Sequence, residues 1–471
     1  MKNKYISLIK DTLIFALGTI GSKIILFILV PLYTNCLTPS EYGIADLVFS
    51  MAQLLIPFAC LGVYYAILRF GLEKKENADD ALFSGIIVAS VGAFIVICLT
   101  PLLSFYKTLS DWKWYFCVYL ILHLYLSIFQ NYAKAIGKNK TYAIISIAYT
   151  AVLALLNIFF LLYEKRGIHG YLIANVLATI FAAMAYIFTC KIFFIHKIAK
   201  FNGYLLKKML IYSLPLMIDG IIWWFIQSSN KLFIEFFLNS EILGLYTVAI
   251  KIPSLMYVVV TIFSQAWGIS TIKEIDKEND ALFYKNVFSV YSVLIVLICM
   301  GIILIIKPFM NFYVHESYFS SWKFIPLLLV SNAFLAISDF FGAFYNALKK
   351  TVNNMLISLL AAVLSVLFSL LFLNIIGLWA AILATFLAYF TIMCIRMLNI
   401  RKYVQIKINF WKFIFNLLIL MTYSVLIILE FNTYVVSIVF FILFFIINLK
   451  IIFEVLTITT KYVKSRIFNK K

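Results

Sequence analysis

LTPSEYGIADL, residues 37–47, follows the first long apolar run of the chain, and a related stretch, LNSEILGLYTV at residues 238–248, follows the seventh. Glycine is the seventh residue of both stretches. A second related pair, GIHGYLIANVLAT at 167–179 and NIIGLWAAILATF at 374–386, opens the sixth and twelfth apolar runs. Matching landmarks at matching positions indicate an internal repeat, so the sequence predicts two copies of one six-helix unit.

The apolar runs themselves indicate the fold class. Hydrophobic residues make up 64% of the 471 and charged residues only 13%, which is unlike the composition of soluble domains. Runs of about 20 apolar residues match the thickness of a bilayer as helices, and their lack of alternation argues against a membrane β-barrel. We predict an all-α polytopic membrane protein with about 14 transmembrane helices. The predicted spans are 12–34, 42–66, 81–104, 113–133, 142–162, 169–190, 210–238, 242–268, 286–309, 322–346, 353–373, 377–398, 411–429 and 434–457.

The repeat also predicts how these helices are grouped. Six is an even number, so both copies start on the same side of the membrane and the repeat is parallel. This arrangement is typical of two lobes around a central cavity that opens alternately to either side. We predict an N-terminal six-helix lobe over residues 1–200 and a C-terminal six-helix lobe over 201–400. Two additional transmembrane helices and a basic cytoplasmic tail follow over 401–471.

Lysine and arginine indicate the orientation, since short cytoplasmic loops hold an excess of both. Of the 39 basic residues, 30 lie on the side of the two termini and six on the opposite side, so we predict that both termini are cytoplasmic. This distribution and attraction to anionic membrane lipids explain the net charge of +19 without nucleic-acid binding. We expect no cleavable signal peptide, because the first apolar run is too long for one.

Topology leaves three basic residues unexplained: Lys23, Lys231 and Lys251. Lys23 lies about eleven residues, or roughly 17 Å, from either end of its predicted helix, too deep for its side chain to reach the interface. We predict that all three line a wet cavity and bind an anion such as pyrophosphate. For Lys231, an ion pair with Glu235 on the same helix face explains the charge equally well. Arg69, at the inner end of the second helix, is a fourth candidate, with a simple orientation charge as the alternative.

Three carboxylates also fall within the spans, Asp46, Asp219 and Asp339. A buried carboxylate can take up a proton during a transport cycle. It can equally neutralise a lysine or mark a helix end. We therefore predict that these residues take part in coupling or gating, with structural pairing as the alternative.

Prolines interrupt the opening helices of each repeat unit. Pro31, Pro215 and Pro253 lie in the first, seventh and eighth spans, and Pro57 lies in the second. Proline removes a backbone hydrogen bond and bends a helix, which membrane proteins tolerate where neighbours satisfy the freed groups. We predict that these residues are gating hinges, with static kinks as the alternative.

Neither the cysteines nor the histidines form a pattern typical of a chemical site. Seven cysteines and four histidines are dispersed singly, which favours neither a metal site nor a disulfide framework. We predict no catalytic residues, no metal and no cofactor. Every predicted outer loop has about 12 residues or fewer, which argues against a membrane polymerase or glycosyltransferase. Three lysines against a few acids disfavour a drug exporter, because organic cations prefer an acidic cavity.

The LTPSEYGIADL stretch, the helix YSLPLMIDGIIWWFIQSSNKLFIEFFL at 212–238 and the plan of six, six and two helices resemble the MOP (multidrug/oligosaccharidyl-lipid/polysaccharide) exporter superfamily. The best fit is to Wzx-type flippases for O-antigen of lipopolysaccharide or for capsule. Many relatives carry an Asp-Arg pair in the seventh helix where this chain has Asn230 and Lys231, so the cation is kept and the acid is lost. The arginine-rich first helix typical of lipid II flippases is not obvious here.

The resemblance implies a multi-pass protein of the bacterial cytoplasmic (inner) membrane. Such proteins move an undecaprenyl-pyrophosphate-linked oligosaccharide from the inner to the outer leaflet, with proton or sodium as the expected coupling ion. It further implies a monomer that contacts the polysaccharide polymerase and chain-length machinery, and a groove for the polyprenyl tail on the last two helices. Alternatives within the superfamily are a flippase for lipid II, teichuronic or another lipid-linked polysaccharide, and a multidrug exporter.

Overall fold

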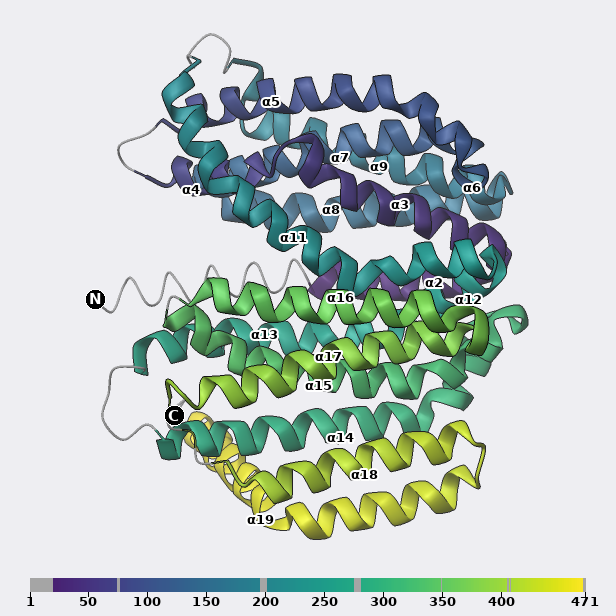
Figure 1. Cartoon of the computed structure of the whole chain (residues 1–471), viewed down its shortest axis with the longest axis vertical. Helices are drawn as coiled ribbons and strands as arrows, with labels where there is room; N and C mark the ends of the chain where they lie inside the picture. The colour runs from purple at the N-terminus through teal and green to yellow at the C-terminus, as the bar shows by residue number, and fades with distance from the viewer. Residues whose placement is uncertain are drawn as a thin grey trace. The chain divides into compact units, whose positions relative to one another are not determined.

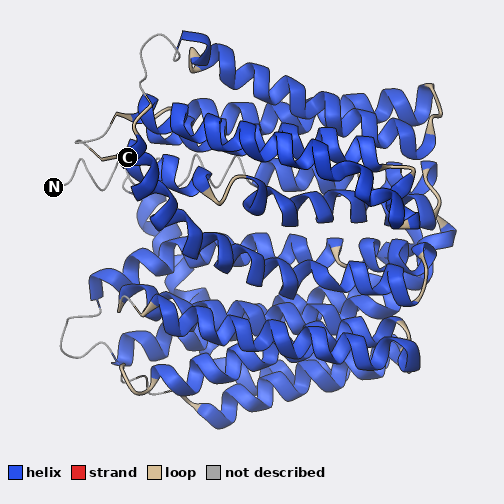
Figure 2. Cartoon of the chain, turned by 45° about the horizontal axis from the view of Figure 1, so that its top comes forward, coloured by secondary structure: helices blue, strands red, loops and turns tan. Residues whose placement is uncertain are grey.

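The computed structural model describes residues 20–73, 77–194, 201–274, 281–348, 350–404, 406 and 408–468. Within these residues every regular element is a helix (Figure 2). Thirteen of the described helices are long and apolar enough to cross a membrane, and Ile20–Cys36 is a shorter apolar helix. The predicted all-α membrane protein with about 14 transmembrane helices is therefore confirmed. The first predicted span, 12–34, lies partly outside the described residues.

The helices divide into two compact units (Figure 1). The first holds the described residues up to Val248 together with Val314–Tyr318, and the second holds Ala249–Tyr313 and the described residues from Phe319 onward. The predicted lobe limits at residues 200 and 400 follow the sequence repeat rather than these contacts, and they stay a prediction.

The first unit is built around α7, against which α3, α4, α5 and α9 pack. Its core is made of aliphatic side chains such as Ile67, Leu82 and Leu124, which are buried completely. The elements of this unit are α2 (Val30–Cys36), α3 (Pro39–Ala59), α4 (Val63–Gly71), α5 (Ala78–Leu99), η1 (Thr100–Phe105), α6 (Lys107–Ser110), α7 (Lys113–Ala135), α8 (Asn139–Asn157), η2 (Ile158–Tyr163), α9 (Gly167–Thr189), η3 (Ile192–Phe194), α11 (Gly203–Phe237) and α12 (Ser240–Ala249).

The TPSE letters of the first landmark stretch form the start of α3. The Thr38 hydroxyl accepts a hydrogen bond from the Glu41 backbone N–H at 3.3 Å, and the Glu41 carboxylate accepts one from the Thr38 N–H at 2.9 Å. This reciprocal cap satisfies backbone donors that a helix start leaves unpaired, and Pro39 fits the first helical turn because its missing N–H is not needed there. The motif therefore fixes where α3 begins.

The glycines of the two landmark stretches lie against each other where α3 and α12 cross. A Cβ atom on Gly43 would lie only 2.6 Å from the Ser240 carbonyl oxygen and 2.7 Å from the Gly244 nitrogen. A Cβ atom on Gly244 would collide with the Pro39 carbonyl group. Only glycine permits such a close approach of two backbones, so the shared glycine of the repeat has a direct packing role.

The second predicted span, 42–66, is two helices rather than one. α3 ends at Ala59 and α4 begins at Val63, and Leu61 and Gly62 between them have positive φ angles of 50° and 64°. Ser213 of α11 donates a hydrogen bond of 2.8 Å to the Leu61 carbonyl oxygen at this break. Membrane helices tolerate a break when a neighbouring side chain satisfies the freed backbone group, and Ser213 does so here.

The second unit is centred on α15, which packs against α13, α14, α17 and α18 and buries most of its side chains. The Trp267 ring of α13 stacks on the Phe340 ring of α15 with centroids 4.4 Å apart, and its indole N–H donates to the Phe340 carbonyl oxygen at 2.9 Å. The elements of this unit are α13 (Lys251–Glu274), α14 (Ala281–Tyr313), α15 (Ile325–Ala347), α16 (Thr351–Ile376), α17 (Leu378–Ile400), α18 (Phe410–Ile428) and α19 (Thr433–Phe468). η4 (Glu316–Phe324) begins in the first unit and ends in the second.

Candidate functional site

A buried ion pair joins α3 and α11 in the first unit. The Lys231 ammonium lies 2.7 Å from Asp46 Oδ2 and donates a hydrogen bond of 2.7 Å to the Ser50 hydroxyl. Thr247 of α12 donates to the same Asp46 oxygen at 3.4 Å. The side chains of Lys231 and Asp46 are only 10% and 13% exposed. We call Lys231 and Asp46 the first charge pair.

Helical periodicity explains how the first charge pair is assembled. Asp46 and Ser50 are four residues apart on α3 and therefore share a helix face. Trp224 and Lys231 are seven residues apart on α11 and also share a face. The Trp224 indole N–H donates to the Ser50 carbonyl oxygen at 2.8 Å, so both side chains of α11 dock on the same turn of α3.

The structure overturns the proposed ion pair between Lys231 and Glu235. Thr108 and Ser240 each donate a hydrogen bond of 2.9 Å to the Glu235 carboxylate, while Lys231 turns to Asp46. The spacing of four residues permits a local pair but does not enforce one. A carboxylate that lies 185 residues away in the sequence is the partner instead.

A second buried pair joins α15 and α17 in the second unit. Arg396 Nη1 lies 3.5 Å from Asp339 Oδ1 and donates a hydrogen bond of 2.9 Å to the Ser338 hydroxyl. The Tyr257 hydroxyl of α13 donates to Asp339 Oδ2 at 2.5 Å. The Arg396 side chain is 2% exposed and that of Asp339 is 20% exposed. We call Arg396 and Asp339 the second charge pair.

A glycine makes room for the Arg396 guanidinium. A Cβ atom on Gly342 would lie 3.1 Å from Arg396 Nη1 and 3.5 Å from Cζ. Gly342 follows Ser338 by four residues and so lies on the same face of α15. The cation therefore packs over a small residue, next to its hydroxyl and carboxylate partners.

Arg396 was not predicted as a site residue. In the sequence it lies near the end of the predicted span 377–398, where a basic residue is expected to mark the cytoplasmic side of the membrane. In the structure α17 continues to Ile400 and Arg396 is buried. The sequence did hold a signal for its burial. Arg396 lies within the otherwise uncharged stretch IMCIRMLNI, residues 392–400, and the next basic residue is Arg401.

The other predicted charged residues lie elsewhere on the helices. Lys23 is exposed on the helix Ile20–Cys36, Lys251 is the first residue of α13 and partly exposed, and Asp219 is partly exposed on α11. Their predicted roles in substrate binding and coupling stay predictions. Arg69, in the last turn of α4, pairs with Glu73 at 3.2 Å, and the two side chains are 59% and 36% exposed. This placement suits an orientation charge, and substrate binding by Arg69 stays a prediction.

Two of the predicted hinge prolines adjoin helix interruptions. Residue 29 interrupts the helix just before Pro31, and Ile250 separates α12 from α13 three residues before Pro253. Proline at 253 cannot donate to the carbonyl group four residues earlier, which accounts for the second interruption. Pro215 lies inside the continuous α11, and Pro57 lies near the end of α3. Whether any of them is a moving hinge stays a prediction.

Comparison with known proteins identifies the family. Residues 8–268 match the family model described as "Polysaccharide biosynthesis protein". The chain belongs to this family. No curated protein sequence matches it significantly.

Solved structures show a similar fold at low sequence identity. The lipid II flippase MurJ, in an inward closed conformation, is 12% identical to this chain with a TM-score of 0.67. The match covers 94% of this chain and 100% of MurJ. A multidrug resistance MATE family transporter of the MOP superfamily, in an inward-facing conformation, is 14% identical with a TM-score of 0.66 over 82% of this chain and 93% of that one. A MOP superfamily transporter from Pyrococcus furiosus is 13% identical with a TM-score of 0.60 over 83% and 95%. These structures thus confirm the predicted fold, which this chain shares with transporters of the MOP superfamily.

Proposed function

We propose that this protein is a flippase that moves an undecaprenyl-pyrophosphate-linked oligosaccharide from the inner to the outer leaflet of the bacterial cytoplasmic membrane. The observation that carries the proposal is a buried cation–carboxylate pair in each unit of a polysaccharide biosynthesis protein. Charges inside membrane helices are costly and tend to mark a transport pathway. The fold similarity to a lipid II flippase supports a lipid-linked cargo. The O-antigen or capsule repeat unit is the expected oligosaccharide.

The pyrophosphate of such a cargo is the group that buried cations would recognise. Lys231 is a compact multi-donor charge and Arg396 a planar fork, and both donate to phosphate oxygens. In the structure each cation is neutralised by a carboxylate. We propose that the cargo's phosphates compete with Asp46 for Lys231, while Lys23 and Lys251 add positive charge along the path.

The carboxylates supply a route to ion coupling. Protonation of Asp46 or Asp339 removes the negative charge that holds its cation, and so frees the cation for an anionic cargo. Binding of the cargo and protonation of these carboxylates are then linked, so that the protonation state sets the affinity for the cargo. Sodium is the alternative ion, since a carboxylate with hydroxyl neighbours also suits a hard cation.

Reconstitution tests this proposal directly. The purified protein in liposomes is given a labelled undecaprenyl-pyrophosphate oligosaccharide, and its arrival in the opposite leaflet is measured with and without proton or sodium gradients. We expect translocation that is faster with one of the gradients. Movement of an organic cation such as ethidium, without movement of the lipid-linked sugar, would instead identify a drug exporter of the MATE type.

A further inference from the structure

A carboxylate that belongs to neither charge pair lies near the end of α11 in the first unit. Glu235 Oε1 accepts hydrogen bonds of 2.9 Å from the hydroxyl groups of Thr108 on α6 and Ser240 on α12. The second oxygen, Oε2, is buried and has no hydrogen-bond partner among the residues that the structure describes. A buried polar atom without a partner is costly, so Oε2 is the atom at which a positively charged ligand would gain most.

The basic residue one helical turn before Glu235 does not balance its charge. Lys231 contacts Asp46 at 2.7 Å and donates a hydrogen bond to the Ser50 hydroxyl. The Glu235 charge instead acts on the Tyr106 phenol, which precedes α6. Burial first, and the Glu235 carboxylate second, raise the pKa of Tyr106. A negative charge therefore faces the segment that holds Tyr106 and Thr108.

The place of Glu235 within α11 adds to this negative potential. α11 ends at Phe237, two residues after Glu235. The last carbonyl groups of a helix have no partner within the helix and give that end a partial negative charge, which attracts cations. Carboxylate, carbonyl and hydroxyl oxygens are ligands that suit a hard cation. The Thr108 and Ser240 hydroxyl oxygens keep lone pairs after donating to Oε1.

The residue types around Glu235 indicate a cation of single charge. Among the described residues, no group of three or more histidine, cysteine, aspartate or glutamate side chains could hold a metal ion. Calcium is usually bound by several carboxylate and carbonyl oxygens together. One carboxylate with two hydroxyl neighbours balances the charge of one sodium ion instead.

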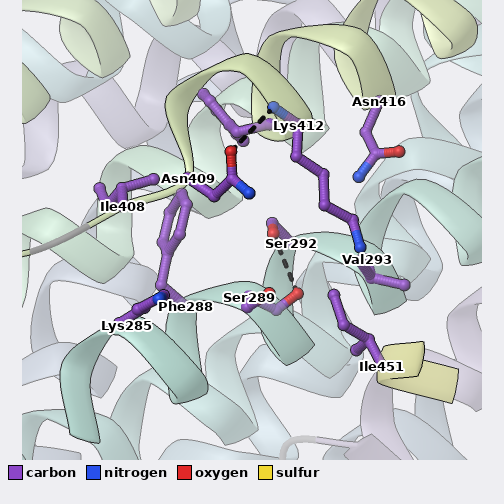
Figure 3. A pocket seen from close by; sticks show the side chains of 11 residues that line it. Lys285, Phe288, Ser289, Ser292, Val293, Ile408, Asn409, Lys412, Asn416 and Ile451 are labelled. Carbon is purple, nitrogen blue, oxygen red and sulfur yellow. Dashed lines mark hydrogen bonds between the residues drawn. The ribbon is translucent and has the colours of Figure 1, made fainter. Parts of the chain in front are cut away.

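The small polar pocket between α14, α18 and α19 in the second unit has the opposite character (Figure 3). Lys285 of α14 and Lys412 of α18 are among its lining residues, and Figure 3 shows Lys412 extending across it. Ammonium groups repel a cation. This pocket therefore does not suit sodium, whereas the oxygens around Glu235 do.

We propose that Glu235, Thr108 and Ser240 bind a sodium ion, with Glu235 Oε2 as the charged ligand and the two hydroxyl groups beside it. The ion would join α6, α11 and α12, the three elements that supply these residues. By the predicted topology this end of α11 faces the outside of the membrane, so external sodium would reach it. The site is separate from the two charge pairs, whose carboxylates already contact a lysine or an arginine, and it does not depend on the cargo.

Binding of radioactive sodium to the purified full chain in detergent tests the proposal, with choline chloride keeping the ionic strength constant. We expect saturable binding that becomes about tenfold weaker in Glu235→Gln, because the charged ligand is lost. Sodium should also raise the melting temperature of the wild type but not that of Glu235→Gln, since a ligand stabilises the folded state that binds it. Glu241→Gln is the matched control, because Glu241 is an exposed carboxylate in the first turn of α12.

Three results would overturn the proposal. The first is equal sodium binding by the wild type and Glu235→Gln, including no saturable binding by either. The second is an equal loss in Glu241→Gln, which would show general attraction to surface charge. The third is a loss in Asp46→Asn with binding kept in Glu235→Gln, which would place the ion at the first charge pair.

A second set of variants keeps the test decisive if Glu235→Gln fails to fold. Thr108→Val and Ser240→Ala each remove one hydroxyl group and keep the carboxylate. Both should weaken sodium binding, because each removes an oxygen next to the ion. Unchanged sodium affinity in both variants would equally contradict the proposal.

Discussion

The two charge pairs differ in how each carboxylate contacts its cation. In the first, Lys231 and Asp46 make a direct contact of 2.7 Å. In the second, Arg396 lies 3.5 Å from Asp339, and the shortest contact of that carboxylate is the 2.5 Å hydrogen bond from the Tyr257 hydroxyl. The first carboxylate therefore has a cation in direct contact, whereas the second has its shortest contact with a phenol.

Because of this difference, we expect the two pairs to lose different amounts of stability when the cation is removed. A buried ion pair gains little over an apolar pair of the same shape, because desolvation offsets the attraction, but loss of one partner leaves a charge stranded. Asp46 would lose its 2.7 Å contact to a cation, while Asp339 would keep the short hydrogen bond from Tyr257. We therefore expect the first pair to be the more sensitive to single substitutions.

The largest effect is expected for Lys231→Ala. Because Asp46 loses the cation in direct contact with it, the variant should lose about 3–5 kcal/mol of stability, measured as a lower melting temperature or midpoint of unfolding of the protein in detergent. Lys207→Ala, at an exposed lysine of the same helix, is the control. The double variant Asp46→Asn with Lys231→Gln removes both charges and should recover most of the loss. If the double variant is as unstable as Lys231→Ala, the cost does not come from the stranded charge.

A smaller effect is expected for Arg396→Ala. Tyr257 continues to donate to Asp339, so the loss should be about 1–3 kcal/mol. Tyr257→Phe in the Arg396→Ala background should then cost more than in the wild type, with a coupling energy of about 0.5–3 kcal/mol. Strictly additive losses would mean that the phenol and the guanidinium do not support the same carboxylate.

The helices were predictable from the sequence, because long apolar runs leave the backbone no other way to satisfy its hydrogen bonds in a membrane. Their ends were less predictable. α14 begins at Ala281 rather than 286, and α11 at Gly203 rather than 210, because helical hydrogen bonding continues into polar segments where the apolar pattern has stopped. The break between α3 and α4 depends on Ser213, a residue distant in the sequence.

The candidate site was predictable in its residue types but not in its pairings. Lys231, Asp46 and Asp339 stood out because charge is rare in apolar runs. Their partners could not be deduced, since a single sequence gives periodicity along one helix but not which helices adjoin. For this reason Glu235, four residues from Lys231, was an available but wrong partner. Arg396 was missed because it lies near a predicted helix end.

A steric test sharpens the account of the second charge pair. In Gly342→Ala the new Cβ atom would lie 3.1 Å from Arg396 Nη1, so the guanidinium must shift from its present position, at a cost of about 1 kcal/mol. Gly301→Ala in α14 is the matched control, since a Cβ atom there has no neighbour within 4 Å and alanine favours a helix. The melting temperature should fall for Gly342→Ala and stay level or rise for Gly301→Ala. Equal changes of the melting temperature in both variants would mean that a Cβ atom at residue 342 does not displace the guanidinium.

The smallest effect on stability is expected at Glu430, whose ion pairs with two lysines are exposed rather than buried. Glu430, between α18 and α19, accepts hydrogen bonds of 2.9 Å from Lys307 and Lys323. Hydrogen bonds and charge from these two lysines lower the pKa of Glu430 from its ordinary value of 4.5 to about 2. Because the pKa is lower in the folded protein, this stabilisation is complete above pH 4.5 and is lost as the pH falls towards about 2.

Glu430→Gln should therefore remove a part of the acid sensitivity. Between pH 5 and about 2 the melting temperature of the wild type should fall more steeply than that of the variant, whereas at neutral pH the variant should be slightly the less stable. Glu316→Gln, at another exposed carboxylate, the first residue of η4, controls for the loss of one carboxylate. Raised salt should shrink the difference because surface charges are screened. The buried pairs should respond little to salt. Parallel acid curves for the wild type and Glu430→Gln would show that the two lysines hold this loop without stabilising the folded protein.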